Sequence, residues 1–341
     1  MLGPLCVGFS AFRVEDWTPD EGAPDLWKLL DKAVCRKGRD SRGRIAVADS
    51  KKLKLSNQSK TRHPLTHLER GVLAFGGLLG GGSETGEPRS GEPVGASGGA
   101  EVPGQDLTTD ELLFGALGVH LESHPLVCAG RRRRCRWRAR RRRTRSRGTC
   151  WRWRARGRVW SRWALACIAV GESEFNEAVR TGGSKAHLTT RCFARYLRRV
   201  VERWGDGSDE VRVVCDRHGG RTSYASMIGT AVRGLGCGVE TLEETERCSR
   251  YVISGGASPE EQGVHVQFRP EAEEAHLPVA LASMTAKMVR ELSMARFNRY
   301  WCARMPELKP TAGYVQDARR WLEDLDGVMY DDEREAMVRQ A

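Results

Sequence analysis

Several patterns that would classify a 341-residue chain directly are missing from this sequence. No apolar run approaches 18 residues, which excludes a typical membrane-spanning helix. The 11 cysteines are scattered, odd in number and never form a Cys-x-x-Cys pair. The eight histidines show no zinc-like spacing, so we expect no zinc site. Because no signal peptide is recognisable, we expect these cysteines to be free thiols in a reducing cytoplasm.

Acidic residues are absent from residues 131–162, a stretch that holds 17 arginines. Removing these 17 positive charges from the formal net charge of +12 leaves −5 for the rest of the chain. The basic character therefore belongs to one tract and not to the fold. Three interpretations of the tract stay open: a basic arm that binds phosphates and stacks tryptophans on bases, low-complexity sequence without a role, and a shifted reading frame in GC-rich DNA. The abrupt change from acidic to basic sequence favours the third.

Apolar periodicity predicts strands that alternate with helices, which is typical of an α/β fold with a mixed sheet. We expect strands over residues 5–14, 44–48, 164–170, 211–216, 250–254 and 264–268, the last two as an antiparallel pair. We expect helices over residues 25–36, 63–75, 109–121, 174–180, 186–204, 223–233, 276–301 and 315–325. The Gly-rich linker from residue 76 and the Arg/Trp-rich tract are expected to form a long disordered insertion over 76–163. This insertion divides one domain into residues 1–75 and 164–341.

Three side chains are spaced four residues apart in the helix expected over residues 276–301. Ser283, Lys287 and Glu291 therefore align on one face of that helix. A hydroxyl, an ammonium and a carboxylate on one face are typical of a phosphate or metal site. An amphipathic helix with solvated charges explains the same pattern.

Three other segments offer groups of similar chemistry. Lys51 and Lys52 follow the expected strand where a loop begins, and they either hold a phosphate or lie in a solvated turn. Asp216 ends an apolar strand, at the edge where ligands collect in open α/β sheets, although a capping role explains it equally well. Tyr314 follows a Pro-containing loop, where a lone tyrosine is usually a packing residue.

These segments together resemble the type 2 ribonuclease H family, that is, ribonuclease HII and its HIII relative. The family has a DSKKL segment after an early strand, matched by residues 49–53, and an acid that ends a central strand, matched by Asp216. It also has a helix of the form ASxxAKxxRD, matched by residues 282–291, and a later Gly-Tyr element, matched by Gly313-Tyr314. The resemblance covers residues 1–75 and 164–325 and implies a ribonuclease H-like mixed sheet flanked by helices.

The resemblance implies an endoribonuclease that cleaves the RNA strand of RNA/DNA hybrids, or DNA with embedded ribonucleotides. Two Mg²⁺ or Mn²⁺ ions held by carboxylates would activate water and stabilise the leaving oxygen. By the match, Asp216 and Glu291 are catalytic metal ligands, and Glu291 stands where the HIII branch has Glu.

The same match gives the remaining candidates their roles. Lys51 and Lys52 would hold the backbone of the hybrid, and Tyr314 would stack near the sugar at the cleavage point. Ser283 and Lys287 would support the site from the helix.

One family motif, GxDEAGxGP, is missing. Gly3-Pro4 matches its second Gly-Pro, but the Asp-Glu pair that supplies the first two carboxylates is absent. We therefore expect this chain, as written, to be inactive or nearly so. Since an apolar strand starts abruptly at Leu5, we hypothesise a start codon upstream, which an in-frame Asp-Glu-Ala-Gly in the DNA would support. The alternative function is a non-catalytic nucleic-acid-binding protein that keeps the basic groove of the fold.

Overall fold

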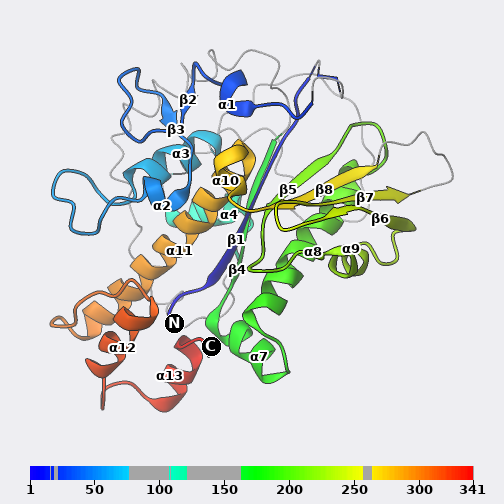
Figure 1. Ribbon diagram of the computed structural model, residues 1–341. Helices are drawn as coiled ribbons and strands as arrows, with labels where there is room; N and C mark the ends of the chain where they lie inside the picture. The colour runs from blue at the N-terminus through cyan, green and yellow to red at the C-terminus, as the bar shows by residue number, and fades with distance from the viewer. Residues whose placement is uncertain are drawn as a thin grey trace, which may run out of the picture.

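The computed structural model describes residues 1–15, 17–18, 22–76, 107, 109–120, 163–255 and 263–340, which form a mixed α/β structure (Figure 1). Its strands are β1 (Leu5–Phe12), β2 (Val34–Cys35), β3 (Ile45–Ala46), β4 (Trp163–Val170), β5 (Arg212–Asp216), β6 (Cys237–Glu244), β7 (Ser249–Gly255) and β8 (Val264–Arg269). Its helices are α1 (Leu26–Leu29), α2 (Ser50–Leu53), α3 (Thr66–Gly76), α4 (Asp110–Ala116), α7 (Glu172–Arg180), α8 (Lys185–Trp204), α9 (Ala225–Ala231), α10 (Ala272–Ala275), α11 (Leu277–Arg304), α12 (Val315–Glu323) and α13 (Asp331–Met337). The Arg/Trp-rich tract and most of the Gly-rich linker lie outside the described residues.

Strands β1 and β4 form an antiparallel pair in the middle of the molecule, with Leu5 opposite Val170 and Phe12 opposite Trp163. Both strands are nearly continuous apolar runs, which is typical of strands covered on both faces. Helix α11 lies against one face, so closely that a Cβ on Gly8 would stand 2.0 Å from the carbonyl oxygen of Ala282. Helix α8 covers the other face, where the ring of Tyr196 stacks on Phe9 at 5.0 Å.

Strands β5 to β8 form a second, four-stranded sheet in the order β5-β8-β7-β6. Strand β5 is parallel to β8, and the other pairs are antiparallel, which confirms the mixed pairing and the predicted β7–β8 hairpin. The sheet packs on α8 and α9 through a cluster in which Phe268 stacks on Tyr224 at 3.7 Å. The sequence predicted one sheet. The described residues instead form separate sheets, and β1 does not pair with β5.

The main core lies between α11, the β1–β4 pair and helices α3 and α4. Met284 and Met288 of α11 are fully buried there, in the same cluster as Leu68, Val72 and Leu113. Helix α4 confirms the short helix expected over residues 109–121, with Thr109 as its N-cap. A second cluster around Trp301 and Trp321 holds the C-terminal half of α11 against α12. The two ends of the described chain lie near each other beside this cluster (Figure 1).

Two predicted segments differ in the structure. The helix expected over residues 25–36 is wrong in its second half, because α1 ends at Leu29 and Val34–Cys35 pair with Ile45–Ala46 as β2 and β3. The loop expected over residues 50–53 is the single-turn helix α2, because the Asp49 carboxylate accepts a hydrogen bond from the Lys51 amide and caps it. Strand β6 and helix α13 were not predicted.

Candidate functional site

Helix α11 is the scaffold on which the predicted site residues gather. It is 28 residues long, about 42 Å at the usual rise of an α-helix. Its apolar side is buried in the core, while Ser283, Lys287 and Glu291 follow one another at helical spacing on another side. The predicted alignment on one face is consistent with their contacts, because each of the three binds a group from a different loop or helix.

Helix α2 is bound to α11 by a hydrogen bond between two hydroxyl groups. The Oγ atoms of Ser50 and Ser283 lie 3.0 Å apart, although the two residues are 233 positions apart in sequence. Ser50 is buried, and Leu53 one turn later anchors α2 in the core. The DSKKL segment and the ASxxAK segment are therefore neighbours, which the sequence resemblance alone did not establish.

The two lysines of α2 have different surroundings. Both are exposed, but the ammonium of Lys52 binds the carboxylate of Glu274 in α10. That hydrogen bond raises the pKa of Lys52 and lowers the pKa of Glu274. Lys51 instead borders a cavity that also touches Asp216. Lys51 is thus better placed than Lys52 to meet an incoming phosphate.

Glu291 lies between two lysines. Its carboxylate is 3.2 Å from the ammonium of Lys287 and 3.9 Å from that of Lys54. The three side chains are only 14–17% exposed, so they are not the solvated charges of an ordinary helix surface. A carboxylate with little exposure is stabilised by such neighbours. Lys54 was not among the predicted residues, although it directly follows the DSKKL segment.

Tyr314 stands beside this carboxylate at the start of α12. The residue is 44% exposed, its hydroxyl binds the ammonium of Lys287, and the Arg290 guanidinium lies 4.4 Å from the ring centre. An aromatic face held among cations and open to solvent suits contact with a sugar or base. Sequence reasoning missed Arg290, although its place in the ASxxAKxxRE segment, directly before Glu291, was the available signal.

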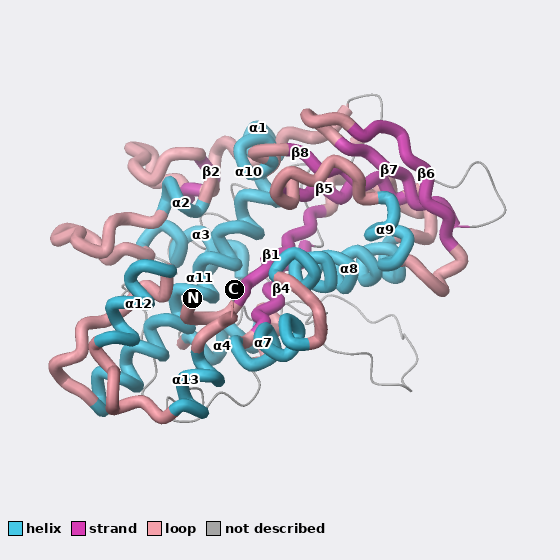
Figure 2. Tube along the Cα trace, turned by 60° about the horizontal axis from the view of Figure 1, so that its bottom comes forward, coloured by secondary structure: helices cyan, strands magenta, loops and turns pink. Residues whose placement is uncertain are grey.

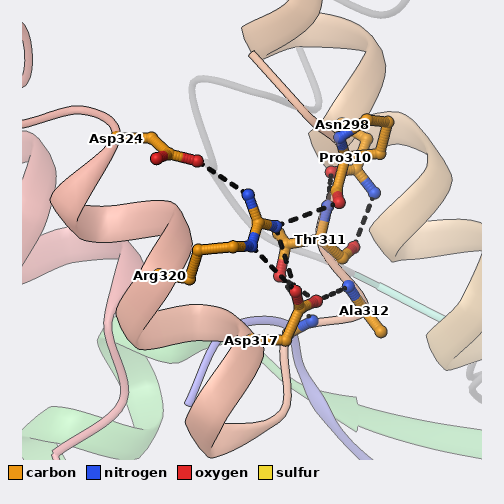
Figure 3. A network of polar contacts seen from close by, with 8 residues as sticks. Asn298, Pro310, Thr311, Ala312, Asp317, Arg320 and Asp324 are labelled. Atoms are coloured by element: carbon orange, nitrogen blue, oxygen red, sulfur yellow. Dashed lines mark hydrogen bonds and ion pairs between the residues drawn. The ribbon is translucent and has the colours of Figure 1, made fainter.

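A polar network fixes the loop that carries Tyr314 (Figure 3). Asn298 on α11 exchanges two hydrogen bonds of 2.8 Å with the backbone of Thr311. The Asp317 carboxylate accepts hydrogen bonds from the Thr311 hydroxyl and the Ala312 amide, and Arg320 pairs with Asp317 and Asp324. Burial acts to raise the pKa of Asp317, but these bonds outweigh it, and the pKa is lowered.

The same loop needs a glycine immediately before Tyr314. Gly313 has a φ of +75°, which L-residues with a side chain adopt only at a cost. A Cβ at this position would also lie 2.7 Å from the carbonyl oxygen of Leu2. The amide of Leu2 in turn donates a 3.0 Å hydrogen bond to the carbonyl of Gly313, so the N-terminal segment and this loop hold each other.

Asp216 and Glu291 contact different groups. Asp216 ends β5, is exposed, and accepts a 3.2 Å hydrogen bond from the Ala272 amide at the start of α10. It shares a cavity lining with Ser283, but Glu291 lies two turns farther along α11, about 12 Å beyond Ser283 at the usual helical rise. Asp49 and Glu273 border that cavity too, and sequence reasoning missed both.

The described residues do not fit the pair of metal ions that the resemblance implies. Nowhere in the described ranges do three His, Cys, Asp or Glu side chains come close enough to hold an ion. Asp216 is engaged by a backbone amide, and Glu291 is neutralised by lysines instead of joining other carboxylates. What the arrangement offers is a set of cations beside an exposed aromatic ring.

Comparison with known proteins adds no assignment: no protein family, no curated protein and no solved structure matches the chain. Among the helices of the described ranges, none is both long enough and apolar enough to cross a membrane.

Proposed function

We propose that this protein acts on RNA/DNA hybrids as an endoribonuclease of the ribonuclease HII type, on a ribonuclease H-like scaffold, with cleavage impaired in the chain as it stands. The observation that carries the proposal is that α2 and the loop with Tyr314, which are distant in sequence, both contact α11. Ser50 binds Ser283, Lys287 binds Tyr314, and both contacts join parts of the chain that the family pattern also combines.

The chemistry of this surface suits a nucleic-acid backbone. Lys51, Lys287 and Arg290 provide positive charge, and such groups neutralise phosphates with release of counterions. Tyr314 presents a ring on which a sugar or base can stack. The RNA/DNA hybrid, or DNA with embedded ribonucleotides, is therefore the proposed partner, and the cytoplasm is the proposed location, since every described cysteine is free.

Mg²⁺ or Mn²⁺ would be the ions for hydrolysis in such an enzyme. Because the described residues do not assemble the required carboxylates, we expect the protein to bind the hybrid but to cleave it very slowly or not at all. The second candidate function, a binding protein without catalysis, is favoured by the ion pairs of Glu291 with Lys54 and Lys287. A carboxylate in these ion pairs holds the two lysine side chains in place and is not free to bind a metal.

One assay separates the two candidates. A hybrid with a labelled RNA strand is incubated with the protein and Mg²⁺ or Mn²⁺, and binding is measured in parallel with Ca²⁺. Slow cleavage that Asp216→Asn abolishes supports the nuclease, with Lys185→Gln on α8 as a control of similar surface exposure. Binding without any cleavage supports the second candidate. Absence of hybrid binding contradicts both.

A further inference from the structure

The first and the last residues of the described structure are paired with each other. Residues 338–340 run antiparallel to the start of the chain, with Leu2 opposite Val338 in an isolated bridge. The amide of Arg339 donates a 2.9 Å hydrogen bond to the carbonyl oxygen of Met1. Both overall views show the two labelled ends of the chain side by side (Figures 1 and 2). We call residues 338–340 the 338–340 segment.

A single buried side chain on α7 holds the 338–340 segment. Asn176 is 1% exposed, and its side-chain nitrogen donates hydrogen bonds of 2.9 Å to the carbonyl oxygens of Glu335 and Val338. Its side-chain oxygen accepts a 2.8 Å hydrogen bond from the Gln340 amide. Both N–H donors and the oxygen of Asn176 are therefore used on one short stretch of chain. Because a buried amide is costly without such partners, the fit between α7 and this stretch depends on Asn176.

Arg339 also holds the 338–340 segment against α7, through its side chain. The residue is only 6% exposed, and its guanidinium lies 5.1 Å from the centre of the Phe175 ring. Glu172, at the start of α7, is buried as well and accepts a 2.9 Å hydrogen bond from the Gly3 amide. Burial raises the pKa of Glu172, whereas the positive charges of Arg339 and Arg290 act to lower it. The same carboxylate thus attracts one arginine of the segment and one arginine of α11.

Leu2 connects the 338–340 segment with the loop that carries Tyr314. It is fully buried, its amide donates a hydrogen bond to the Gly313 carbonyl, and its own carbonyl accepts a 3.4 Å hydrogen bond from Arg290. The same guanidinium nitrogen donates a 3.2 Å hydrogen bond to another carbonyl of that loop. The guanidinium also lies 4.4 Å from the centre of the Tyr314 ring. A shift of Leu2 would therefore move both the backbone and the cation that hold this ring.

We propose that Asn176 and Arg339 are positioning residues of the candidate site, which hold the 338–340 segment against Leu2 and so fix the orientation of Tyr314. The inference rests on the proposed function, in which Tyr314 stacks on a sugar or base of the hybrid. Tyr314 is 44% exposed, so its orientation depends on its loop and on Arg290 more than on packing around the ring. Asn176 and Arg339 are buried, and they would act on a bound strand only through this loop.

Hydrogen exchange of the full-length protein tests the structural part of the proposal. Asn176→Leu keeps a side chain of similar size and removes the three hydrogen bonds. Exchange in fragments that cover residues 309–314 should become about tenfold faster, while β7 should not change. Arg339→Met keeps an apolar stem and gives the same readout through a separate contact, should Asn176→Leu not fold. The control is Ile228→Val, which removes one carbon from a different core cluster.

A double-mutant cycle for hybrid binding tests the link to Tyr314. The Kd of a labelled hybrid is measured by fluorescence anisotropy for wild type, Asn176→Leu, Tyr314→Ala and the double variant. We expect Asn176→Leu to weaken binding about fivefold, and to have no further effect when Tyr314 is already replaced. A merely structural loss would weaken binding by the same factor in both backgrounds.

The outcomes of the two measurements are distinct. Faster exchange confined to the loop, together with a binding effect that Tyr314→Ala abolishes, supports the proposal. Unchanged exchange in the loop overturns it, and so does exchange that rises equally in β7 or in the Ile228→Val control. Unchanged hybrid affinity, or equal weakening in both backgrounds, overturns it as well. If the wild type does not bind the hybrid, the proposed function fails, while faster exchange confined to the loop still supports the hold of Asn176 and Arg339 on Tyr314.

Discussion

At the scale of single residues, the sequence predicted the position of Glu291 on its helix but not the side chains that it contacts. The four-residue spacing of Ser283, Lys287 and Glu291 was enough to place them on one face of a helix. It did not reveal their partners Ser50, Tyr314 and Lys54, because these come from segments that are distant in sequence or outside any motif. Without the partners, a metal ligand and one member of a salt-bridge cluster look the same.

Replacing Glu291 with Gln should destabilise the protein by about 1–3 kcal/mol, because two little-exposed lysines lose their countercharge. Urea unfolding of the variant, of Lys287→Met and of the double variant measures the coupling between the two side chains. We expect a coupling of about 0.5–3 kcal/mol, as for other contacting pairs. Additive effects would show that the ion pair contributes nothing.

Gly313→Ala should destabilise the protein more than a matched change elsewhere. Gly327 has nearly the same backbone conformation, with a φ of +76°, but no atom lies within 4 Å of an added Cβ. Gly327→Ala therefore reports the conformational cost alone, about 1–2 kcal/mol. Gly313→Ala adds the clash with Leu2, and thermal unfolding should reveal at least about 1 kcal/mol beyond the control. Equal shifts for the two variants would contradict the described loop.

At the scale of elements, strands and helices with strong apolar periodicity were predicted to within a few residues. Helix α8, helix α11 and strand β4 belong to this group. Strand β6 was missed because most of its residues are exposed, and its strand conformation depends on pairing with β7. Helix α2 was missed because a single turn has no periodicity, and only the Asp49 cap indicates it.

The junction between α11 and α12 should lose stability in acid through Asp317. Since the pKa of Asp317 is lowered by folding, its contribution is present above its ordinary value of 3.8 and is lost as the pH falls through the lower folded value. The stability difference between wild type and Asp317→Asn should therefore shrink between about pH 5 and pH 2, by less than about 1 kcal/mol because the side chain is 38% exposed. Urea unfolding across this range measures it. A difference that stays constant would contradict the assigned network.

At the scale of the whole molecule, the α/β class followed from the order of the elements, whereas the division into separate sheets did not. Which strands become neighbours depends on contacts between distant segments, and the local patterns of β1 and β5 do not indicate that these two strands belong to separate sheets within the described residues. The same limit applies to the site. The motifs indicated which residues to consider, but only the fold shows that Lys51 and Asp216 line one cavity and that Glu291 is not part of its lining.

The central claim is that the surface around α2 and α11 binds RNA/DNA hybrids, and salt-dependent binding tests it most directly. Fluorescence anisotropy with a labelled hybrid and a DNA duplex of equal length is measured for wild type, Lys51→Gln and the control Lys185→Gln. We predict tighter binding to the hybrid than to the duplex. We also predict a salt slope that falls by about one for Lys51→Gln and stays unchanged for Lys185→Gln. Equal affinity for the two nucleic acids, together with an unchanged slope for Lys51→Gln, would contradict the account.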